Sequence, residues 1–108
     1  MMYFKRKIEE YSKRPEIMEI LSEINASVQV KPLDDEPFFV KVSGGVVEIN
    51  EGEMADPLVT VVAKSSDLIK LINREADPFS YYLTGRVRVM GRVLEAAELL
   101  RVLLRGAK

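Results

Sequence analysis

The side chains that could do chemistry form a restricted set, because the sequence contains neither histidine nor cysteine. Without cysteine there is no thiol nucleophile and no disulfide, and the usual zinc ligands are missing. Without histidine no Ser–His–Asp triad can form, and the commonest general base near neutral pH is absent. Catalysis would have to use carboxylates, lysine, tyrosine or serine. We therefore expect no catalytic residue, no metal and no cofactor.

The carboxylates offer two kinds of chemistry, a cation site and acid–base catalysis. Asp34, Asp35 and Glu36 are adjacent, and carboxylate oxygens are ligands for hard cations. Three adjacent acids lack the spaced ligands of a calcium loop, so we interpret them as a solvated loop. An enzyme would need two acids that converge in a pocket, drawn from Asp34, Asp35, Asp56 and Asp77. We expect these acids to be scattered and the protein not to be an enzyme.

The basic residues in GRVRVMG, residues 85–91, raise the question of polyanion binding. Arg86 and Arg88 alternate with Val87 and Val89, so a strand here would have one basic side and one apolar side. A protein that stacks nucleic-acid bases needs aromatic side chains among the basic ones, and this strand has none. The sequence pI of about 5.6 also argues against nucleic acid. We expect the arginines to face solvent or pair with acids, and the valines to face the interior.

The glycines do not form a phosphate-binding fingerprint. Gly44-Gly45 is too short for one and is not followed by Lys-Ser or Lys-Thr. The glycines of 85–91 flank an expected strand instead of opening a helix. Both patterns are better interpreted as turns.

The spacing of apolar residues predicts helices near both ends of the chain and strands between them. Gly44-Gly45 is expected to be a hairpin turn, and Asp77 is expected to cap the helix that follows it. In chain order the predicted elements are helices at 3–11 and from Pro15, strands at 28–33, 38–43, 47–50 and 58–63, a helix capped by Ser65 or Ser66, a short helix after Asp77, a strand at 86–90 and a helix at 93–104.

This order of elements predicts an α+β fold, with a five-stranded, mainly antiparallel sheet covered on one face by helices. Residues 58–63 are expected to form the third antiparallel strand after the hairpin. The chain of 108 residues is expected to be a single domain, 1–108. No apolar run approaches the roughly 20 residues of a membrane span, and the N-terminus has no signal-peptide pattern. We therefore expect no transmembrane segment and a cytoplasmic location.

The chain has more apolar surface than one sheet face should require. The helix at 93–104 has a narrow polar stripe, and the run LVTVVA at 58–63 is nearly all apolar. An internal cavity for a lipid-like ligand would explain this surplus, because such cavities are mostly apolar. A filled core or a dimer interface would explain it equally well. The pattern alone leaves these alternatives open.

The order of motifs in residues 55–100 resembles the sterol carrier protein 2 (sterol-transfer) family. The segment ADPLVTVVAKSSDLIKLINREADPFSYYLTGRVRVMG is followed by an Ala-rich amphipathic helix, as in that family. The positions that carry the resemblance are Asp56, Leu68, Leu71, Asp77-Pro78, Gly85, Arg86, Arg88 and Gly91. The resemblance implies an apolar tunnel between sheet and helices that binds fatty acyl chains, sterols or other lipids without catalysis. Family members also occur as accessory domains of larger enzymes and complexes.

Our leading hypothesis is therefore a cytoplasmic protein that binds a fatty acyl, sterol-like or isoprenoid lipid. The alternative is a protein-interaction or dimerisation module of the same fold with a filled core, an accessory subunit to an enzyme. In that case a homodimer or enzyme partner would contact the C-terminal helix, where Leu94 and Val102 flank the polar stripe. The residues expected to line the lipid pocket are Val40, Val42, Val59, Val61, Leu71, Phe79, Leu83, Val87, Val89, Leu100 and Leu103.

Overall fold

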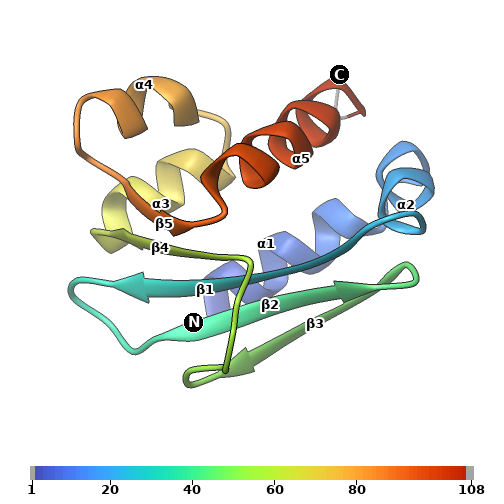
Figure 1. Cartoon of the computed structure of the whole chain (residues 1–108), viewed down its shortest axis with the longest axis horizontal. Coiled ribbons are helices and arrows are strands. Elements are labelled where there is room, and N and C mark those ends of the chain that lie inside the picture. Colours follow the sequence, from blue (N-terminus) through green and yellow to red (C-terminus); the bar gives the residue numbers. More distant parts are fainter. Residues whose placement is uncertain (1, 107–108) are drawn as a thin grey trace.

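The computed structural model describes the backbone of residues 2–106 and the side chains of residues 3–99 and 101. Within this part, no helix is both long and apolar enough to cross a membrane. Figure 1 shows the elements, which in chain order are α1 (Met2–Ser12), α2 (Pro15–Leu21), β1 (Asn25–Pro32), β2 (Phe38–Ser43), β3 (Val46–Glu51), β4 (Val59–Ala63), α3 (Ser65–Ile72), α4 (Pro78–Leu83), β5 (Arg88–Gly91) and α5 (Val93–Gly106).

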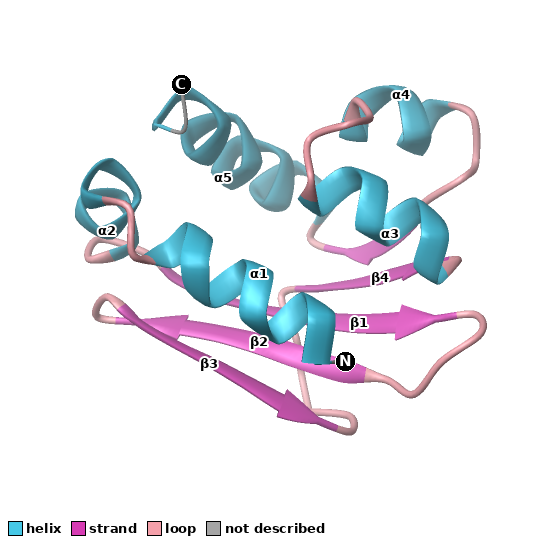
Figure 2. Ribbon diagram, turned by 180° about the vertical axis from the view of Figure 1, so that it is seen from behind, coloured by secondary structure: helices cyan, strands magenta, loops and turns pink. Residues whose placement is uncertain are grey.

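The five strands form one sheet in the order β3-β2-β1-β4-β5, with α1, α3 and α5 on one of its faces (Figure 2). Three of the four strand pairs are antiparallel, and the pair β1–β4 is parallel. The predicted α+β class and the mainly antiparallel five-stranded sheet are confirmed. The side that carries the helices is called the inner face below, and the opposite side is called the outer face.

The place of β4 in the sheet differs from the prediction. It is not the third strand of a meander, because it lies beside β1 and not beside β3. The chain reaches it through a connection, residues 52–58, that crosses β2 and β1 on the outer face (Figure 1). A nearly continuous apolar run is typical of a parallel strand with neighbours on both sides, and LVTVVA has that character. The apolar run indicated that this strand is buried, but it did not indicate which strand lies beside it.

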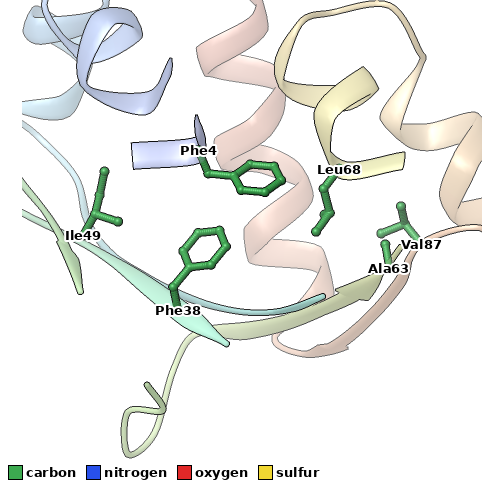
Figure 3. Packing of buried hydrophobic residues seen from close by; sticks show 6 residues of the cluster. All are labelled: Phe4, Phe38, Ile49, Ala63, Leu68 and Val87. Carbon is green, nitrogen blue, oxygen red and sulfur yellow. The ribbon is translucent and has the colours of Figure 1, made fainter. Parts of the chain in front are cut away.

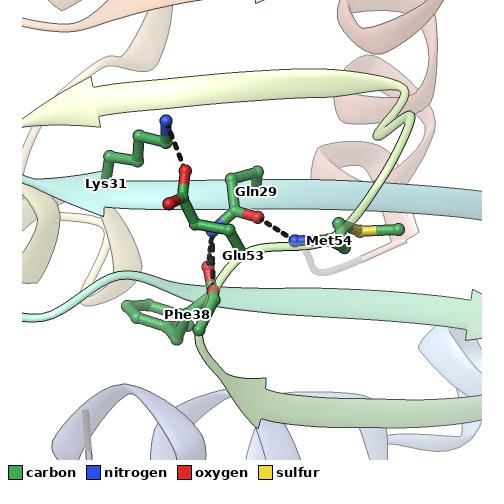
Figure 4. Close-up of polar contacts among 6 residues, drawn as sticks. Gln29, Lys31, Phe38, Glu53 and Met54 are labelled. Carbon is green, nitrogen blue, oxygen red and sulfur yellow. Dashed lines mark hydrogen bonds and ion pairs between the residues drawn. The ribbon is translucent and has the colours of Figure 1, made fainter.

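Gln29 holds this crossover against the sheet. It lies on the central strand β1, points to the outer face and is only 2% exposed. Its side-chain amide donates to the carbonyls of Phe38 and Gly52, each at 3.0 Å, and its carbonyl oxygen accepts from the amide of Met54 at 2.8 Å (Figure 4). Polar groups are buried at little cost only when they are hydrogen-bonded. The three hydrogen bonds of Gln29 provide partners both for its own side-chain amide and for backbone groups of the crossover.

The apolar core joins the inner face of the sheet to α1 and α3 (Figure 3). Phe4 of α1 stacks on Phe38 of β2, with their ring centroids 5.4 Å apart. The buried members of this cluster are Phe4, Phe38, Ile49, Ala63, Leu68 and Val87. Aromatic side chains bury large areas, so the Phe4–Phe38 pair helps to hold α1 against the sheet.

The start of the chain's last strand also differs from the prediction. Residues 86 and 87 were expected in the strand, but their amides donate to the carbonyl of Tyr81, at 2.9 and 3.2 Å. They therefore end the turn after α4, and β5 begins at Arg88. At the other end Gly91 has φ of 107°, and a Cβ there would lie 2.6 Å from the carbonyl oxygen of Leu58. Only glycine fits this approach of β5 to β4.

The start of α3 is capped from a distance. Neither Ser65 nor Ser66 is the N-cap, which is Lys64 and makes no side-chain cap bond. The carboxylate of Asp34, in the β1–β2 connection, accepts instead from the amide of Ser65 at 2.8 Å. This hydrogen bond lowers the pKa of Asp34. The acidic turn is thus not merely solvated, since one of its carboxylates fastens α3 to the sheet.

We expect Gln29→Leu to lower the free energy of unfolding by about 3 kcal/mol, because it leaves buried polar groups of Phe38, Gly52 and Met54 without partners. The control is Lys31→Ala on the same strand and face. Lys31 pairs with Glu53 of the crossover at 2.7 Å, but both side chains are exposed, so its loss should cost less than about 1 kcal/mol. Urea unfolding measures both values, and equal losses would contradict the role given to Gln29.

The lowered pKa of Asp34 makes its contribution to stability depend on pH. A carboxyl group whose pKa is lower in the folded state stabilises it above the unfolded pKa, near pH 4, and the stabilisation disappears as pH falls through the folded pKa. Asp34→Asn should therefore reduce stability at neutral pH and flatten its decline in acid. Urea unfolding between about pH 7 and pH 2 tests this. The neighbouring Glu36→Gln is the control, and an equally flat curve for it would refute the assignment.

Candidate ligand-binding site

The inner face of the sheet is an apolar floor built by strand alternation. Because successive side chains point to opposite faces, every second residue of each strand lies on the same side. The register places Val28 of β1 between Val40 of β2 and Val59 of β4. One step further along the sheet, Val30 pairs with Val61, which in turn pairs with Val89 of β5. The floor is therefore formed by valines across four strands.

The burial of this floor is uneven. Val59 is buried, whereas Val28, Val30, Val40 and Val61 are only half-buried. The strands β1, β2 and β4 each have neighbours on both sides, so these side chains do not lie at an edge of the sheet. The helices thus leave the middle of an apolar sheet face incompletely covered, and an apolar surface there can contact a ligand.

The structure brings most of the predicted lining residues to this side of the molecule. Val87 belongs to the core cluster, and Val40, Val61, Leu71 and Val89 pack against it. Val59 is buried on the floor, while Val42 lies at its edge and lines a hollow at the end of the sheet.

The remaining predicted residues lie farther from the floor or are not described. Phe79 on α4 is half-buried, and the guanidinium carbon of Arg101 lies 5.9 Å from its ring centroid. Leu83, at the end of α4, is 82% exposed. The side chains of Leu100 and Leu103 lie outside the described residues.

The helix α4 covers the inner side only loosely. It has no buried residue, although Asp77 caps it as predicted by accepting from the amide of Phe79 at 3.1 Å. Its main anchor is Tyr81, which packs against the core and accepts backbone hydrogen bonds from Arg86 and Val87. Since helix stability in proteins comes mostly from tertiary packing, α4 is the weakest part of the helix layer.

The arginines of the segment 85–91 lie away from the floor. The guanidinium of Arg86 lies 5.2 Å from the Tyr81 ring centroid and 3.7 Å from a carboxylate oxygen of Asp67. Arg88 is exposed on the outer face of β5. One arginine thus pairs with an acid and the other faces solvent, as the sequence predicted.

Two of the candidate catalytic acids serve structural purposes. Asp34 and Asp77 accept hydrogen bonds at the starts of α3 and α4, and Asp56 has a left-handed backbone (φ 50°) in the crossover. Among the described side chains, no group of three or more acids is placed to hold a metal ion.

Two hollows lie at the end of the sheet where β1 begins. The larger, about 720 Å³, is bounded by β1, β2, Arg92 and the crossover residues 56–58. The smaller, about 400 Å³, lies between the α2–β1 turn and α5 and is lined by Ile24, Leu58 and Leu99 with glutamates at its rim. Sequence reasoning did not identify either one, because each combines residues whose proximity depends on the crossover.

Comparisons with known proteins agree with this architecture. A model of the SCP-2 sterol transfer family matches residues 4–104. No curated protein matches the chain in sequence. The sterol carrier protein domain 2 of Helicoverpa armigera has a similar structure, with a TM-score of 0.79, 16% identity, and alignment over 98% of this chain and 86% of that one.

Two further structures place the same fold in other settings. The UbiJ-SCP2 ubiquinone synthesis protein aligns with a TM-score of 0.68 and 16% identity over 88% of this chain and 79% of its own. The sec-alkylsulfatase Pisa1 from Pseudomonas sp. aligns with a TM-score of 0.70 and 16% identity over 79% of this chain. The match covers only 14% of the alkylsulfatase, so it concerns one part of a much longer chain. At these identities the structures show a shared fold, and the match over residues 4–104 shows that the chain belongs to the SCP-2 sterol transfer family.

Proposed function

We propose that this protein binds an apolar small molecule on the inner face of its sheet and carries it without catalysis. The observation that carries the proposal is the half-buried row of valines in the middle of the sheet, beneath the helices. An apolar ligand would gain about 25 cal/mol for each Å² of apolar surface removed from water there. Membership of a sterol transfer family supports the same function.

The ligand class follows from the chemistry of the floor. Its side chains are aliphatic, and Arg86 lies away from the floor, where it contacts Tyr81 and Asp67. The floor therefore selects for apolar area rather than for a charged group. We propose a fatty acyl, sterol-like or isoprenoid lipid, and the ubiquinone synthesis protein of the same fold makes the isoprenoid class worth testing. A cytoplasmic location remains a prediction.

Native mass spectrometry of the purified protein, with solvent extraction of any bound lipid, is the first test. A near-stoichiometric apolar molecule is the expected result and would identify its class. The proposal would be overturned if the measured mass is that of the protein alone and the protein takes up none of a fluorescent fatty acid, a fluorescent sterol and a short-chain quinone.

We expect Val61→Phe to reduce the affinity for that ligand by at least about tenfold, which is about 1.4 kcal/mol, because the larger ring occupies space on the floor. The control is Val62→Phe on the same strand, where the side chain points to the outer face beside Lys31 and Arg88. It should leave the affinity unchanged. Fluorescence titration measures binding, and urea unfolding establishes that both variants fold. Equal loss of binding in the two variants would contradict the position of the site.

A second function, as an accessory subunit with a filled core, is favoured by exposed apolar side chains on two helices. Leu94 on α5 is 84% exposed, and Leu83 on α4 is 82% exposed. Isolated exposed leucines are common, but two on the helix layer are compatible with a partner that covers it. The alkylsulfatase provides an example of this fold within a longer enzyme chain.

Size-exclusion chromatography with light scattering distinguishes this second function from the first. A lipid carrier should be a monomer whose mass does not change in Leu94→Glu. A dimer that Leu94→Glu converts to monomer would support the accessory function. In Leu33→Glu, which removes another exposed leucine from the β1–β2 connection, the oligomeric state should be unchanged in either case.

A further inference from the structure

The larger hollow has a polar wall on the outer face of the sheet. Ser27 and Lys41 are register partners, and both point to the same face as Gln29, opposite the helices. The crossover forms the facing wall, and Arg92 lies at one end. Its volume of about 720 Å³ lies within the range of small-molecule sites, about 300–1,000 Å³. Its polar side chains are Asn25, Ser27, Lys41, Ser43, Asp56 and Arg92.

The walls of this hollow are fixed relative to one another. The amide of Leu58 donates to the backbone carbonyl and the hydroxyl of Ser27, at 2.9 and 3.0 Å. The amide of Arg92 donates to the carbonyl of Leu58 at 2.9 Å. Because the Ser27 hydroxyl accepts the bond from Leu58, its own proton remains available to donate into the hollow. The backbone of the walls and the Ser27 hydroxyl are thus held in place before any ligand arrives.

Several of these side chains have unused hydrogen-bonding capacity. Within the described residues, the side chains of Asn25, Lys41, Ser43 and Asp56 make no hydrogen bond or ion pair. Arg92 has one contact, at 3.7 Å to a carboxylate oxygen of Glu95, and both side chains are largely exposed. Such exposed pairs contribute little, so the guanidinium can turn to a ligand at small cost. The hollow therefore offers two cations, two hydroxyls and one amide as donors.

We propose that this hollow binds a phosphate group whose ester carries neighbouring hydroxyls. A guanidinium, an ammonium and hydroxyl donors match the several oxygens of a phosphate. The Asp56 carboxylate would repel a bare anion but can accept hydrogen bonds from hydroxyls. The site should therefore prefer a hydroxylated ester to inorganic phosphate. Its polar side chains Ser27 and Lys41 point to the sheet face opposite the apolar floor, whereas Ala26 and Val42, which also line the hollow, point to the floor's side. The proposed ligand is an anion and so differs from the apolar ligand of the floor.

The test is a ¹H–¹⁵N NMR titration of the whole protein with glycerol 3-phosphate and, separately, with inorganic phosphate. The amides of Ser27, Lys41, Ser43 and Arg92 should shift, and the ester should bind more tightly than inorganic phosphate. We expect K41Q and R92Q each to weaken binding about tenfold. The control K70Q removes the same charge from exposed Lys70 on α3 and should leave the affinity unchanged.

Asp56→Asn tests the preference for hydroxyls. Asparagine tolerates a positive φ, so the crossover keeps its shape. Inorganic phosphate should then bind more tightly and the advantage of glycerol 3-phosphate should shrink. An unchanged ratio of the two affinities would contradict the role of Asp56.

The phosphate could belong to a soluble ester or to a lipid headgroup, and sedimentation with vesicles separates the two. Binding to phosphatidylcholine vesicles that contain phosphatidylglycerol, lost in K41Q and R92Q, identifies a headgroup. Binding of glycerol 3-phosphate without vesicle binding identifies a soluble ester. The proposal is overturned if neither probe shifts the four amides, or if K70Q weakens binding as much as K41Q.

Discussion

The crossover between β3 and β4 is the feature on which the sheet's organisation depends. It carries the chain past two strands, so that β4 pairs in parallel with β1 and a fifth strand can pair with β4. A backbone segment laid over a sheet brings amides and carbonyls that need partners. Gln29 on the central strand is the partner of two of these groups, the carbonyl of Gly52 and the amide of Met54, and it also donates to the carbonyl of Phe38. One buried side chain thus makes an otherwise costly connection compatible with the fold.

The crossover also separates the two faces by chemistry. The crossover lies on the outer face, and the helices lie on the inner one, where the valines of β1, β2, β4 and β5 are in register. The outer face keeps polar residues such as Ser27, Lys41 and Arg88. An apolar ligand and an anionic one would therefore meet opposite sides of the same sheet. The strands that form the floor of one site form the wall of the other.

The sequence predicts this fold well where the determining interactions are local. Period-two alternation identifies the hairpin and the inner-face valines Val40 and Val42, and Asp77 caps α4 as its position before Pro78 indicated. The failures involve partners that are distant in sequence. Asp34 caps a helix 31 residues away, and Gln29 bonds to Met54, 25 residues away. Neither contact produces a periodic pattern in the sequence. The position of β4 in the sheet, the cap of α3 and both hollows therefore could not be predicted.

The energetics of an apolar cavity indicate which part of the molecule must adapt to a lipid. An empty, rigid cavity of about 300 Å³ would cost about 7 kcal/mol, at about 24 cal/mol per Å³. A whole domain is stable by only about 5–15 kcal/mol, so the space for a ligand has to open largely when the ligand enters.

The helices differ in how easily they could provide that space. In α1, Phe4 stacks on Phe38, and Tyr3 accepts a 2.6 Å hydrogen bond from the side chain of Asn73, which follows α3. Asp34 fastens the other end of α3. By contrast, none of the described side chains of α4 or α5 is fully buried. Because α4 has no buried residue, moving it breaks few contacts. We therefore expect α4 to be the part of the wall that yields to a lipid, while α1, α3 and the sheet keep the floor in place.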